Sequence, residues 1–258
     1  MFKKKKTEIK KYNNFLEALS NCINAGYENS TLCEVVALKT LQYKSTLQTP
    51  PFLIKPVQSF LSLVVQHILL ENNNQQISVV DFGGACGAHF FETKRFVSNN
   101  VFMKWSVVET GEMISHARKH HLESRELQFY NNLNDVSGDL AYFSSSIQYV
   151  PDPYSTIDLL LSKRFPYILF NRMMLNAASS EDLIIVQQSW LSANGPGIVD
   201  TGIQDRIIKY PHTTLSETKF MKKFEAEYEL VFKFDESSGK IEQNNSNIVG
   251  GGFLFKRK

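Results

Sequence analysis

The sequence predicts an α/β fold with a mostly parallel sheet and helices on both faces, and three observations support this prediction. From residue 77 onward, short apolar runs alternate with helical segments, as is typical of a parallel sheet. The first apolar run ends in a glycine-rich turn, DFGGACG at residues 81–87. Two further apolar runs come late in the sequence with the polar loop 235–247 between them, which indicates an antiparallel pair.

The 258 residues are expected to divide into a helical extension, residues 1–75, and an α/β domain, residues 76–258. Within residues 12–48, apolar side chains recur at helical spacing with a break at Gly26. A further helix places the apolar residues around 60–68 on one face. The extension is therefore expected to consist of helices separated by short breaks.

The α/β domain is expected to contain seven strands joined by helices. The strands fall at residues 77–82, 105–109, 127–130, 139–143, 167–170, 228–234 and 252–256. Helices are expected at 90–96, 113–121, 154–161 and 219–224, the last with Ser216 as its N-cap. The segment 172–215 has few helix signals, so we expect a long irregular connection there, of the kind that often forms a binding loop.

Composition and charge restrict the function classes. Apolar residues make up 43% and charged residues 21%, which is ordinary for a globular chain with a sizeable core. The net charge of +2 is too close to zero to indicate a nucleic-acid binder. The apolar runs are too short to span a bilayer, and the lysine-rich start lacks the apolar segment of a secretory signal. The cysteines include no C-x-x-C pair, which favours a cytoplasmic protein without disulfides or a zinc site: Cys22, Cys33 and Cys86.

The glycine-rich turn is the strongest functional signal. A strand that ends in such a turn and leads into a helix places backbone N–H groups around a ligand, because glycine tolerates positive φ and close backbone approach. The glycines are Gly83, Gly84 and Gly87, and the acid Asp81 precedes them. An acid at this position repels the phosphates of a dinucleotide but suits a cation, such as the amino group or sulfonium of S-adenosylmethionine. The turn therefore predicts a Rossmann-like domain with S-adenosylmethionine as its cofactor.

Three polar residues at strand ends complete the predicted cofactor site. Glu109 ends the second apolar run, 28 positions after Asp81, where a carboxylate can accept hydrogen bonds from both ribose hydroxyls. Dinucleotide sites place this acid about 20 residues after the turn. Asn131 follows the third strand, where it can meet the adenine amino group, and Ser144 follows the fourth, beside the expected cofactor.

Four stretches of the chain resemble one known family, a little-characterised group of class I S-adenosylmethionine-dependent methyltransferases often encoded near bacterial surface-polysaccharide genes. They are residues 15–28, 79–96, 144–153 and 210–217. The resemblance implies the seven-stranded class I methyltransferase sheet, S-adenosylmethionine as cofactor, and a role in polysaccharide biosynthesis. The fifth strand of the group tends to end in an Asp–Arg pair, whereas this chain has Asn171-Arg172, so any role of that acid as a base is lost.

Candidates for acceptor binding and proton transfer lie in the segment 172–215. Arg172 can clamp an anionic acceptor, such as a nucleotide-linked sugar, or else form a salt bridge with Glu181 or Asp182. His212 can act as a general base, because an unshifted imidazole titrates near neutral pH, or else be a surface histidine. Other side chains of this segment that can line the acceptor site are Gln187, Gln188, Trp190 and Tyr210.

Histidines elsewhere in the chain do not indicate a metal site. His116 and His120 are spaced i, i+4, but the acid of an H-E-x-x-H motif is missing between them, which favours an exposed basic helix. His89 begins the helix after the glycine turn, where it can approach the cofactor. Cys86 lies within the turn, where we expect it to be a packed small residue.

Three functions are compatible with these patterns. The first is methyl transfer to an oxygen or nitrogen atom of a small-molecule or glycan acceptor, without a nucleic-acid or membrane partner. The second is a non-catalytic S-adenosylmethionine-fold binding protein in a biosynthetic complex, because Asn171 is no acid and no clear base is present. The third is an NAD-dependent oxidoreductase, which Asp81 and the closing strand pair disfavour.

Overall fold

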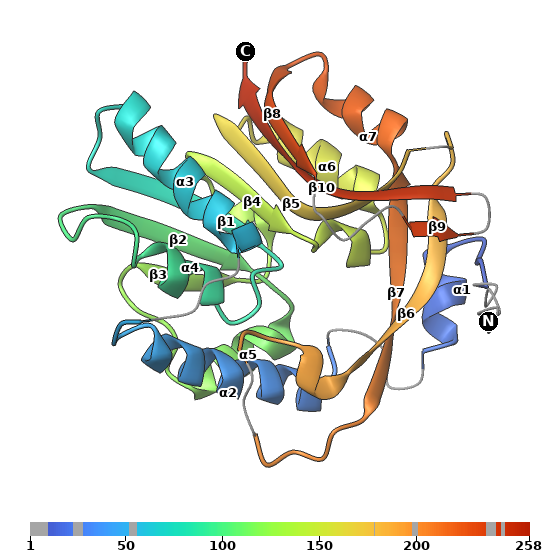
Figure 1. The fold of residues 1–258 in the computed structure, drawn as a ribbon, viewed down its shortest axis with the longest axis horizontal. Coiled ribbons are helices and arrows are strands. Elements are labelled where there is room, and N and C mark those ends of the chain that lie inside the picture. Colours follow the sequence, from blue (N-terminus) through green and yellow to red (C-terminus); the bar gives the residue numbers. More distant parts are fainter. Residues whose placement is uncertain are drawn as a thin grey trace, which may run out of the picture.

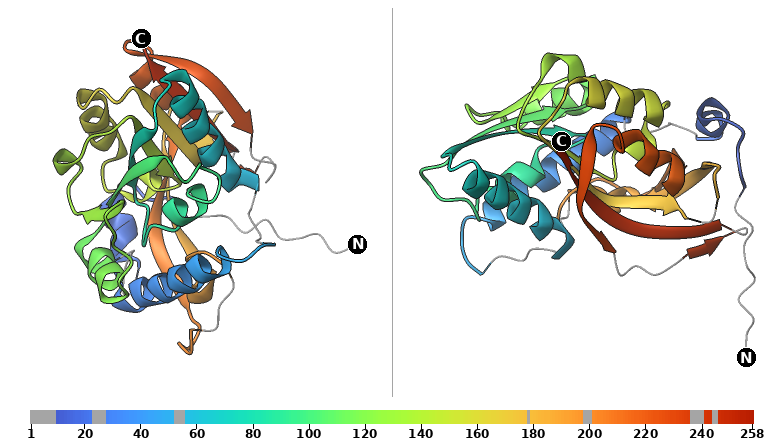
Figure 2. Two further views of the ribbon diagram at one scale, coloured as in Figure 1. Left: turned by 90° about the vertical axis from the view of Figure 1, so that its left-hand side faces the viewer. Right: turned by 90° about the horizontal axis from the view of Figure 1, so that it is seen from above.

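A computed structural model describes residues 10–22, 28–51, 56–177, 179–197, 201–235, 241–243 and 246–258 (Figure 1). The expected helix break at Gly26 and the lysines before residue 10 lie outside these residues. The described strands join one sheet of ten strands, and helices cover both of its faces (Figure 2). None of the described helices is both long and apolar enough to cross a membrane.

The main path of the sheet has the strand order β3-β2-β1-β4-β5-β10-β8. The strands β1 to β5 run parallel to one another, whereas β10 is antiparallel to both β5 and β8. This path confirms the seven predicted strands and the antiparallel pair that closes the sheet. Their bounds are β1 (Gln76–Phe82), β2 (Phe102–Val108), β3 (Leu127–Tyr130), β4 (Leu140–Ser144), β5 (Tyr167–Asn176), β8 (Tyr228–Asp235) and β10 (Ser246–Arg257), with the short β9 (Ile241–Gln243) beside β10.

The predicted irregular connection at residues 172–215 is wrong. β5 continues to Asn176, and β6 (Leu183–Trp190) then pairs along its whole length with β7 (Ile207–Ser216) in an antiparallel hairpin. The end of β7 joins the end of β5 in parallel, with Leu215 opposite Leu175. Both strands of the hairpin are rich in β-branched residues, which favour a pleated, half-buried surface. The scarcity of helix signals in this segment therefore reflects strands.

Each face of the sheet has its own hydrophobic core. Successive strand side chains point to opposite faces, so Val79 packs in one core and Val80 in the other. The first core includes side chains of α2 (Ser30–Thr46), α3 (Pro56–Glu71), α4 (Ala88–Thr93) and α5 (Gly111–Lys119). The second includes side chains of α6 (Pro153–Ser162) and α7 (Glu217–Phe224), while α1 (Phe15–Ser20) lies against the β6–β7 hairpin (Figure 1).

Side-chain caps set the starts of the helices that follow the strands. Thr110 accepts a hydrogen bond from the Met113 N–H at the start of α5, and Asp152 accepts one from the Ser155 N–H at the start of α6. Ser216 caps α7, as predicted from the sequence. Short 3-10 turns lie between the other elements: η1 (Leu133–Asp135), η2 (Ile147–Tyr149) and η3 (Leu191–Ala193).

The helix α2 connects several parts of the fold. The Tyr43 hydroxyl donates a hydrogen bond to Oε2 of Glu92 in α4 at 2.7 Å. The buried Lys39 side chain donates from Nζ to the carbonyl oxygen of Ser192 in η3, also at 2.7 Å. α2 therefore links the helix after the glycine turn with the far end of the β6–β7 hairpin.

Candidate functional site

Four parallel strands bring the predicted site residues to one edge of the sheet. Gly83, directly after β1, donates from its N–H to the carbonyl oxygen of Val108 at the end of β2, and Ser145, directly after β4, donates to the carbonyl oxygen of Asn171 in β5, both at 2.9 Å. The carboxyl ends of β2, β1, β4 and β5 therefore lie side by side. Because the chain order reverses between β1 and β4, this edge holds the topological switch point where ligands of open α/β sheets bind.

The glycine turn depends on the conformational freedom of Gly83. Its φ is +67°, and an added Cβ would lie 2.4 Å from Cβ of Ser146, in the loop after β4. The loops after β1 and β4 therefore approach each other more closely than any side chain on Gly83 would allow. The turn also holds Ala85 at a φ of +50° and Gly87 at +82°. Backbone strain at Ala85 is of the kind that concentrates at functional sites.

Asp81 lies beneath the glycine turn and is fully buried. Its Oδ2 accepts a hydrogen bond from Nε1 of Trp105 at 3.2 Å and lies 3.0 Å from Nδ1 of His89. An added Cβ on Gly84 would lie 2.4 Å from the Asp81 carboxyl carbon, so the backbone of the turn packs directly against this carboxylate. Its Oδ1 has no hydrogen-bond partner among the described residues.

Glu109 ties the end of β2 to the glycine turn. Its Oε1 accepts a hydrogen bond from the Ala85 N–H at 3.0 Å, and its Oε2 accepts one from the Thr110 N–H at 2.8 Å. Partial burial raises the pKa of Glu109 to about 7 despite these two bonds, and the negative charge of Asp81 adds to the rise. Near neutral pH this carboxyl group can therefore both donate and accept hydrogen bonds.

Arg172 turns toward Ser144. Its Nε donates to Oγ of Ser144 at 2.9 Å, and its Nη2 donates to the Ser144 carbonyl oxygen at 3.2 Å. The expected alternative, a salt bridge with Glu181 or Asp182, is not formed; Asp182 accepts hydrogen bonds from Tyr154 and Ser216 instead. The exposed Arg172 side chain therefore lies at the same edge as the glycine turn.

The backbone is strained at Arg172, and its neighbour Asn171 is hydrogen-bonded on both sides of its amide. The φ of Arg172 is +54°, and that of Ser145 in the adjacent loop is +59°. Oδ1 of Asn171 accepts from the Arg172 N–H at 2.9 Å, and Nδ2 donates to the Tyr142 hydroxyl at 3.3 Å. Asn171 therefore holds the backbone at Arg172, where the pairing of β5 with β10 is irregular.

His212 is a buried residue of β7, so the expectation of a surface histidine is wrong. The Gln148 amide nitrogen donates to its Nε2 at 2.7 Å, and its Nδ1 lies 3.3 Å from the Thr214 hydroxyl. Burial lowers the pKa of His212 to about 4, so the ring is neutral at physiological pH. Both ring nitrogens have partners within the protein, which leaves neither open to an acceptor in this arrangement.

Of the remaining sequence candidates, Gln187 and Tyr210 lie opposite each other in the β6–β7 pairing. Tyr149 of η2 donates its hydroxyl proton to Oε1 of Gln187 at 3.0 Å, and its ring meets Tyr210 edge-on at 5.5 Å. Trp190 is 55% exposed at the end of β6. Asn131 is exposed directly after β3. The hairpin thus brings Gln187 and Tyr210 to the loop after β4, whereas Trp190 lies at its far end.

Trp105 and Tyr142 belong to the site but were not predicted from the sequence. Both are fully buried strand residues: Trp105 donates to Asp81 beneath the glycine turn, and the Tyr142 hydroxyl accepts from Asn171 of β5. Tyr142 lies opposite Asp81 in the β1–β4 register, which places their side chains on the same face. Only this register, which one sequence does not reveal, could have identified them.

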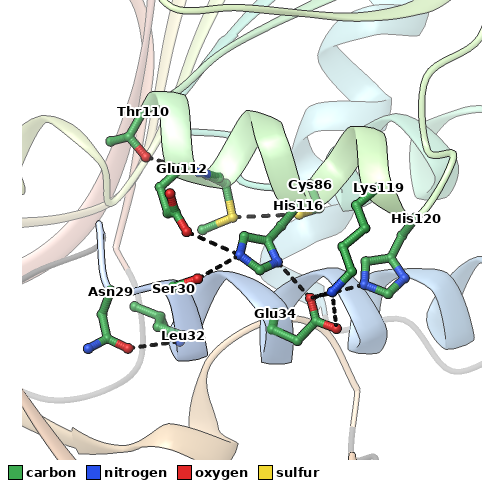
Figure 3. Close-up of polar contacts among 11 residues, drawn as sticks. Asn29, Ser30, Leu32, Glu34, Cys86, Thr110, Glu112, His116, Lys119 and His120 are labelled. Carbon is green, nitrogen blue, oxygen red and sulfur yellow. Dashed lines mark hydrogen bonds and ion pairs between the residues drawn. The ribbon is translucent and has the colours of Figure 1, made fainter.

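A second polar cluster joins α2 to α5 close to the turn (Figure 3). Glu34 accepts hydrogen bonds from His116 at 2.6 Å and from Lys119 and His120 at 3.1 Å. Partial burial of Glu34 is outweighed by these three bonds, which hold its pKa at about 2. The histidines are therefore partly buried helix contacts, which corrects the expectation of an exposed basic helix.

Cys86 packs beneath the same cluster, with its Sγ 3.5 Å from Sδ of Met113 (Figure 3). The residue is fully buried, and this burial raises the pKa of its thiol. Cys86 is therefore an unreactive packed residue, as expected from the sequence. Among the described residues, no group of histidine, cysteine and acidic side chains is arranged to hold a metal ion.

No family model matches the chain, and neither does any curated protein sequence. Solved structures do resemble it. One is S-adenosylmethionine-bound CalS10, an amino pentose methyltransferase from Micromonospora echinaspora; it is 13% identical, with a TM-score of 0.50 over 79% of this chain and 92% of that one. A methyltransferase from Clostridium acetobutylicum is 15% identical, with a TM-score of 0.46 over 76% and 89% of the two chains. The CalS10 likeness, together with the strand order, confirms the predicted fold class.

Proposed function

We propose, because the chain has the class I methyltransferase fold, that it binds S-adenosylmethionine at the carboxyl edge of its sheet and transfers the methyl group to a small acceptor. The observation that carries this proposal is the hydrogen bond from the Ala85 N–H, in the glycine turn, to the Glu109 carboxyl group. This bond holds an acid that can bind a ribose next to a backbone that a ligand can approach closely.

The residues at this edge fit the cofactor. The absence of a Cβ at Gly83 lets Ser146 pack against the turn, and the buried Ser146 Oγ has no hydrogen-bond partner among the described residues. In the proposed complex, Glu109 binds the ribose hydroxyls and Asn131 binds the adenine amino group. The rest of the cofactor faces the backbones of Gly83, Gly84 and Gly87 and the Ser144 hydroxyl. Asp81 contributes its negative charge from beneath the turn.

The charges of the turn favour S-adenosylmethionine over NAD. Asp81 and Glu109 place two carboxyl groups against the turn, where a dinucleotide would place its pyrophosphate. Ionised carboxylates repel phosphates and attract the ammonium and sulfonium groups of S-adenosylmethionine. The antiparallel closing pair β10–β8 also supports the methyltransferase interpretation.

In methyl transfer the bound cofactor supplies an activated methyl group, and the protein aligns the acceptor for in-line attack. Arg172 keeps further guanidinium N–H groups beyond the two that bind Ser144, so it can hold a phosphate or carboxylate of the acceptor. We propose an anionic small molecule or glycan precursor, such as a nucleotide-linked sugar, as the acceptor. CalS10, which shares the fold, acts on an amino pentose. A cytoplasmic role in polysaccharide biosynthesis suits this substrate class.

A non-catalytic binding protein is the second candidate. Asn171 is an amide held between Arg172 and Tyr142 and cannot take up a proton, and both nitrogens of His212 are occupied. Turnover therefore requires a base elsewhere or an acceptor that is already deprotonated.

Calorimetry and a turnover assay test the proposal. Binding of S-adenosylmethionine or S-adenosylhomocysteine at micromolar affinity, about 8 kcal/mol, with much weaker NAD binding is the expected result. Tight NAD binding without binding of either adenosyl ligand would overturn it. Methyl transfer to members of a panel of phosphorylated and neutral sugars separates the enzyme from the non-catalytic alternative.

A further inference from the structure

His89 stands at the carboxyl edge between the ends of β1 and β4. It is the second residue of α4, directly after the glycine turn. Its Nδ1 lies 3.0 Å from Oδ2 of Asp81, and its side chain is 14% exposed. Its ring meets the Tyr142 ring edge-on, with 5.1 Å between the centroids. The ring is therefore anchored on one side and reaches the surface on the other.

Asp81 determines which nitrogen of His89 carries hydrogen. An ionised carboxylate only accepts hydrogen bonds, so the Nδ1 that faces it must be the N–H of the ring. Trp105 donates to the same oxygen of Asp81 and fixes the carboxylate in this orientation. In a neutral imidazole with hydrogen on Nδ1, Nε2 carries a lone pair and acts as an acceptor. No described residue forms a hydrogen bond with Nε2 of His89.

Asp81 itself cannot meet a ligand in this arrangement. Its side chain has no exposed surface, and the backbone of Gly84 packs against its carboxyl group. The sequence predicts that this acid faces a cationic ligand, but the structure places His89 where Asp81 was expected. The negative charge of Asp81 can therefore act on a ligand only through the His89 ring.

The charge of Asp81 is incompletely balanced. Its one ion-pair partner among the described residues is His89, and its Oδ1 has no hydrogen-bond partner there. A buried carboxylate is costly unless a positive group offsets it. A cationic ligand that donates to Nε2 would supply this positive group through the imidazole, so the Asp81–His89 pair complements a cation.

We propose that Nε2 of His89 accepts a hydrogen bond from the α-ammonium group of S-adenosylmethionine, with Asp81 as the positioning residue that fixes the ring. This inference rests on the proposed cofactor. If Glu109 at the end of β2 holds the ribose, the amino-acid end of the cofactor extends along the edge over β1 toward β4. His89, which contacts Asp81 in β1 and Tyr142 in β4, stands at that place.

Two ligands that differ only at the amino-acid end test this contact. S-adenosylhomocysteine carries the ammonium group, whereas 5′-methylthioadenosine lacks the whole amino-acid end. Calorimetry should show that His89→Ala weakens S-adenosylhomocysteine binding about tenfold or more, the range for a hydrogen bond to a charged group, with 5′-methylthioadenosine affinity unchanged. The exposed histidine of α3 provides the matched control, and His67→Gln should change neither affinity.

Two further variants separate the contact from a merely structural role. His89→Gln keeps an acceptor oxygen near the position of Nε2 and should recover part of the affinity for S-adenosylhomocysteine. Asp81→Asn keeps a carbonyl oxygen where Trp105 and Nδ1 of His89 both donate, so Nε2 remains an acceptor while the negative charge is removed. This variant should leave 5′-methylthioadenosine affinity unchanged and weaken S-adenosylhomocysteine binding less than His89→Ala does. Thermal unfolding of each variant verifies that it is folded.

The outcomes distinguish this inference from the proposed function. If the wild-type protein binds neither ligand, the proposed cofactor is wrong and the inference falls with it. If the wild-type protein binds both ligands and His89→Ala weakens both equally, or neither, the cofactor proposal stands and the role of His89 is overturned. Selective loss of S-adenosylhomocysteine binding in His89→Ala, with a smaller selective loss in Asp81→Asn, supports it.

Discussion

The backbone N–H of Ala85 donates a hydrogen bond to Oε1 of Glu109 at 3.0 Å, which joins the glycine turn to the end of the neighbouring strand β2. Because Oε2 of Glu109 is held by the Thr110 N–H, the carboxyl group has one orientation before any ligand arrives. A site whose polar groups are fixed in advance loses less conformational freedom on binding. The turn and its acid should therefore bind a cofactor as one preorganised unit.

Gly83→Val is expected to abolish binding of S-adenosylhomocysteine. Gly83 has a φ of +67°, and any Cβ there would collide with Ser146, so valine must displace the turn. Calorimetry measures the loss, and circular dichroism must remain native-like. The matched control is Gly111→Ala, because an added Cβ at Gly111 meets no atom within 4 Å. A folded Gly83→Val protein that binds with wild-type affinity would place the cofactor elsewhere.

Glu109→Ala is expected to weaken cofactor binding by about 1.5–3 kcal/mol, the range for hydrogen bonds to a charged group. The measurement belongs above pH 8, where a carboxyl group with a pKa of about 7 is ionised. The wild-type protein should also bind the 2′-deoxy and 3′-deoxy cofactor analogues more weakly than the parent. Equal affinity for all three ligands would show that Glu109 does not contact the ribose.

His212 should make the fold sensitive to acid. Its pKa is about 4 in the folded protein and about 6.5 when unfolded, so the unfolded chain binds more protons between these values. The stability due to the neutral ring is complete above pH 6.5 and is lost as the pH falls through 4. Urea unfolding of wild type and His212→Gln should show a difference in unfolding free energy that shrinks from pH 7.5 to pH 4.5. A constant difference would contradict the buried neutral ring.

Arg172→Ala is expected to separate acceptor binding from cofactor binding. The guanidinium contacts Ser144 and no acidic side chain that the structure describes, so its charge is available to an anionic acceptor. The affinity for S-adenosylhomocysteine should stay within about twofold, and kcat/KM for phosphorylated acceptors should fall about tenfold or more. Arg172→Lys keeps the charge but not the planar fork and should be intermediate. An equal loss for neutral acceptors would indicate that Arg172 only holds the loop after β4.

The sequence was sufficient to predict the seven strands of the main path and the glycine turn, because both depend on local patterns. Apolar runs of strand length, the spacing of Gly83 and Gly87, and Ser216 as a helix cap each involve residues that are near neighbours in the chain. These patterns indicate the same local structure regardless of the tertiary contacts around them. The same patterns placed Glu109 at the end of β2, where it meets the turn.

The sequence was not sufficient to place residues whose contacts depend on strand register or on burial. Trp105 and His89 are 24 and 8 positions from Asp81, and only the β1–β2 register and the path of the turn bring their side chains to one carboxylate. His212 follows a proline in a polar stretch, yet the pairing of β7 with β6 and its packing on η2 bury it. Such residues gain their roles from partners far away in the chain, which a local pattern does not contain.

The hydrogen bond from Lys39 to the Ser192 carbonyl oxygen joins residues 153 positions apart in the chain. It therefore cannot form during synthesis until residue 192 has been added. The apolar face of α2, with Val35 and Val36 fully buried in the finished protein, leaves the ribosome long before the hairpin end it packs against. The contacts of α2 with α4 and α5 can form earlier, because both of these helices precede residue 120. The contacts of α2 with η3 should therefore be the last that this helix makes, formed only after the end of the β6–β7 hairpin has been synthesised.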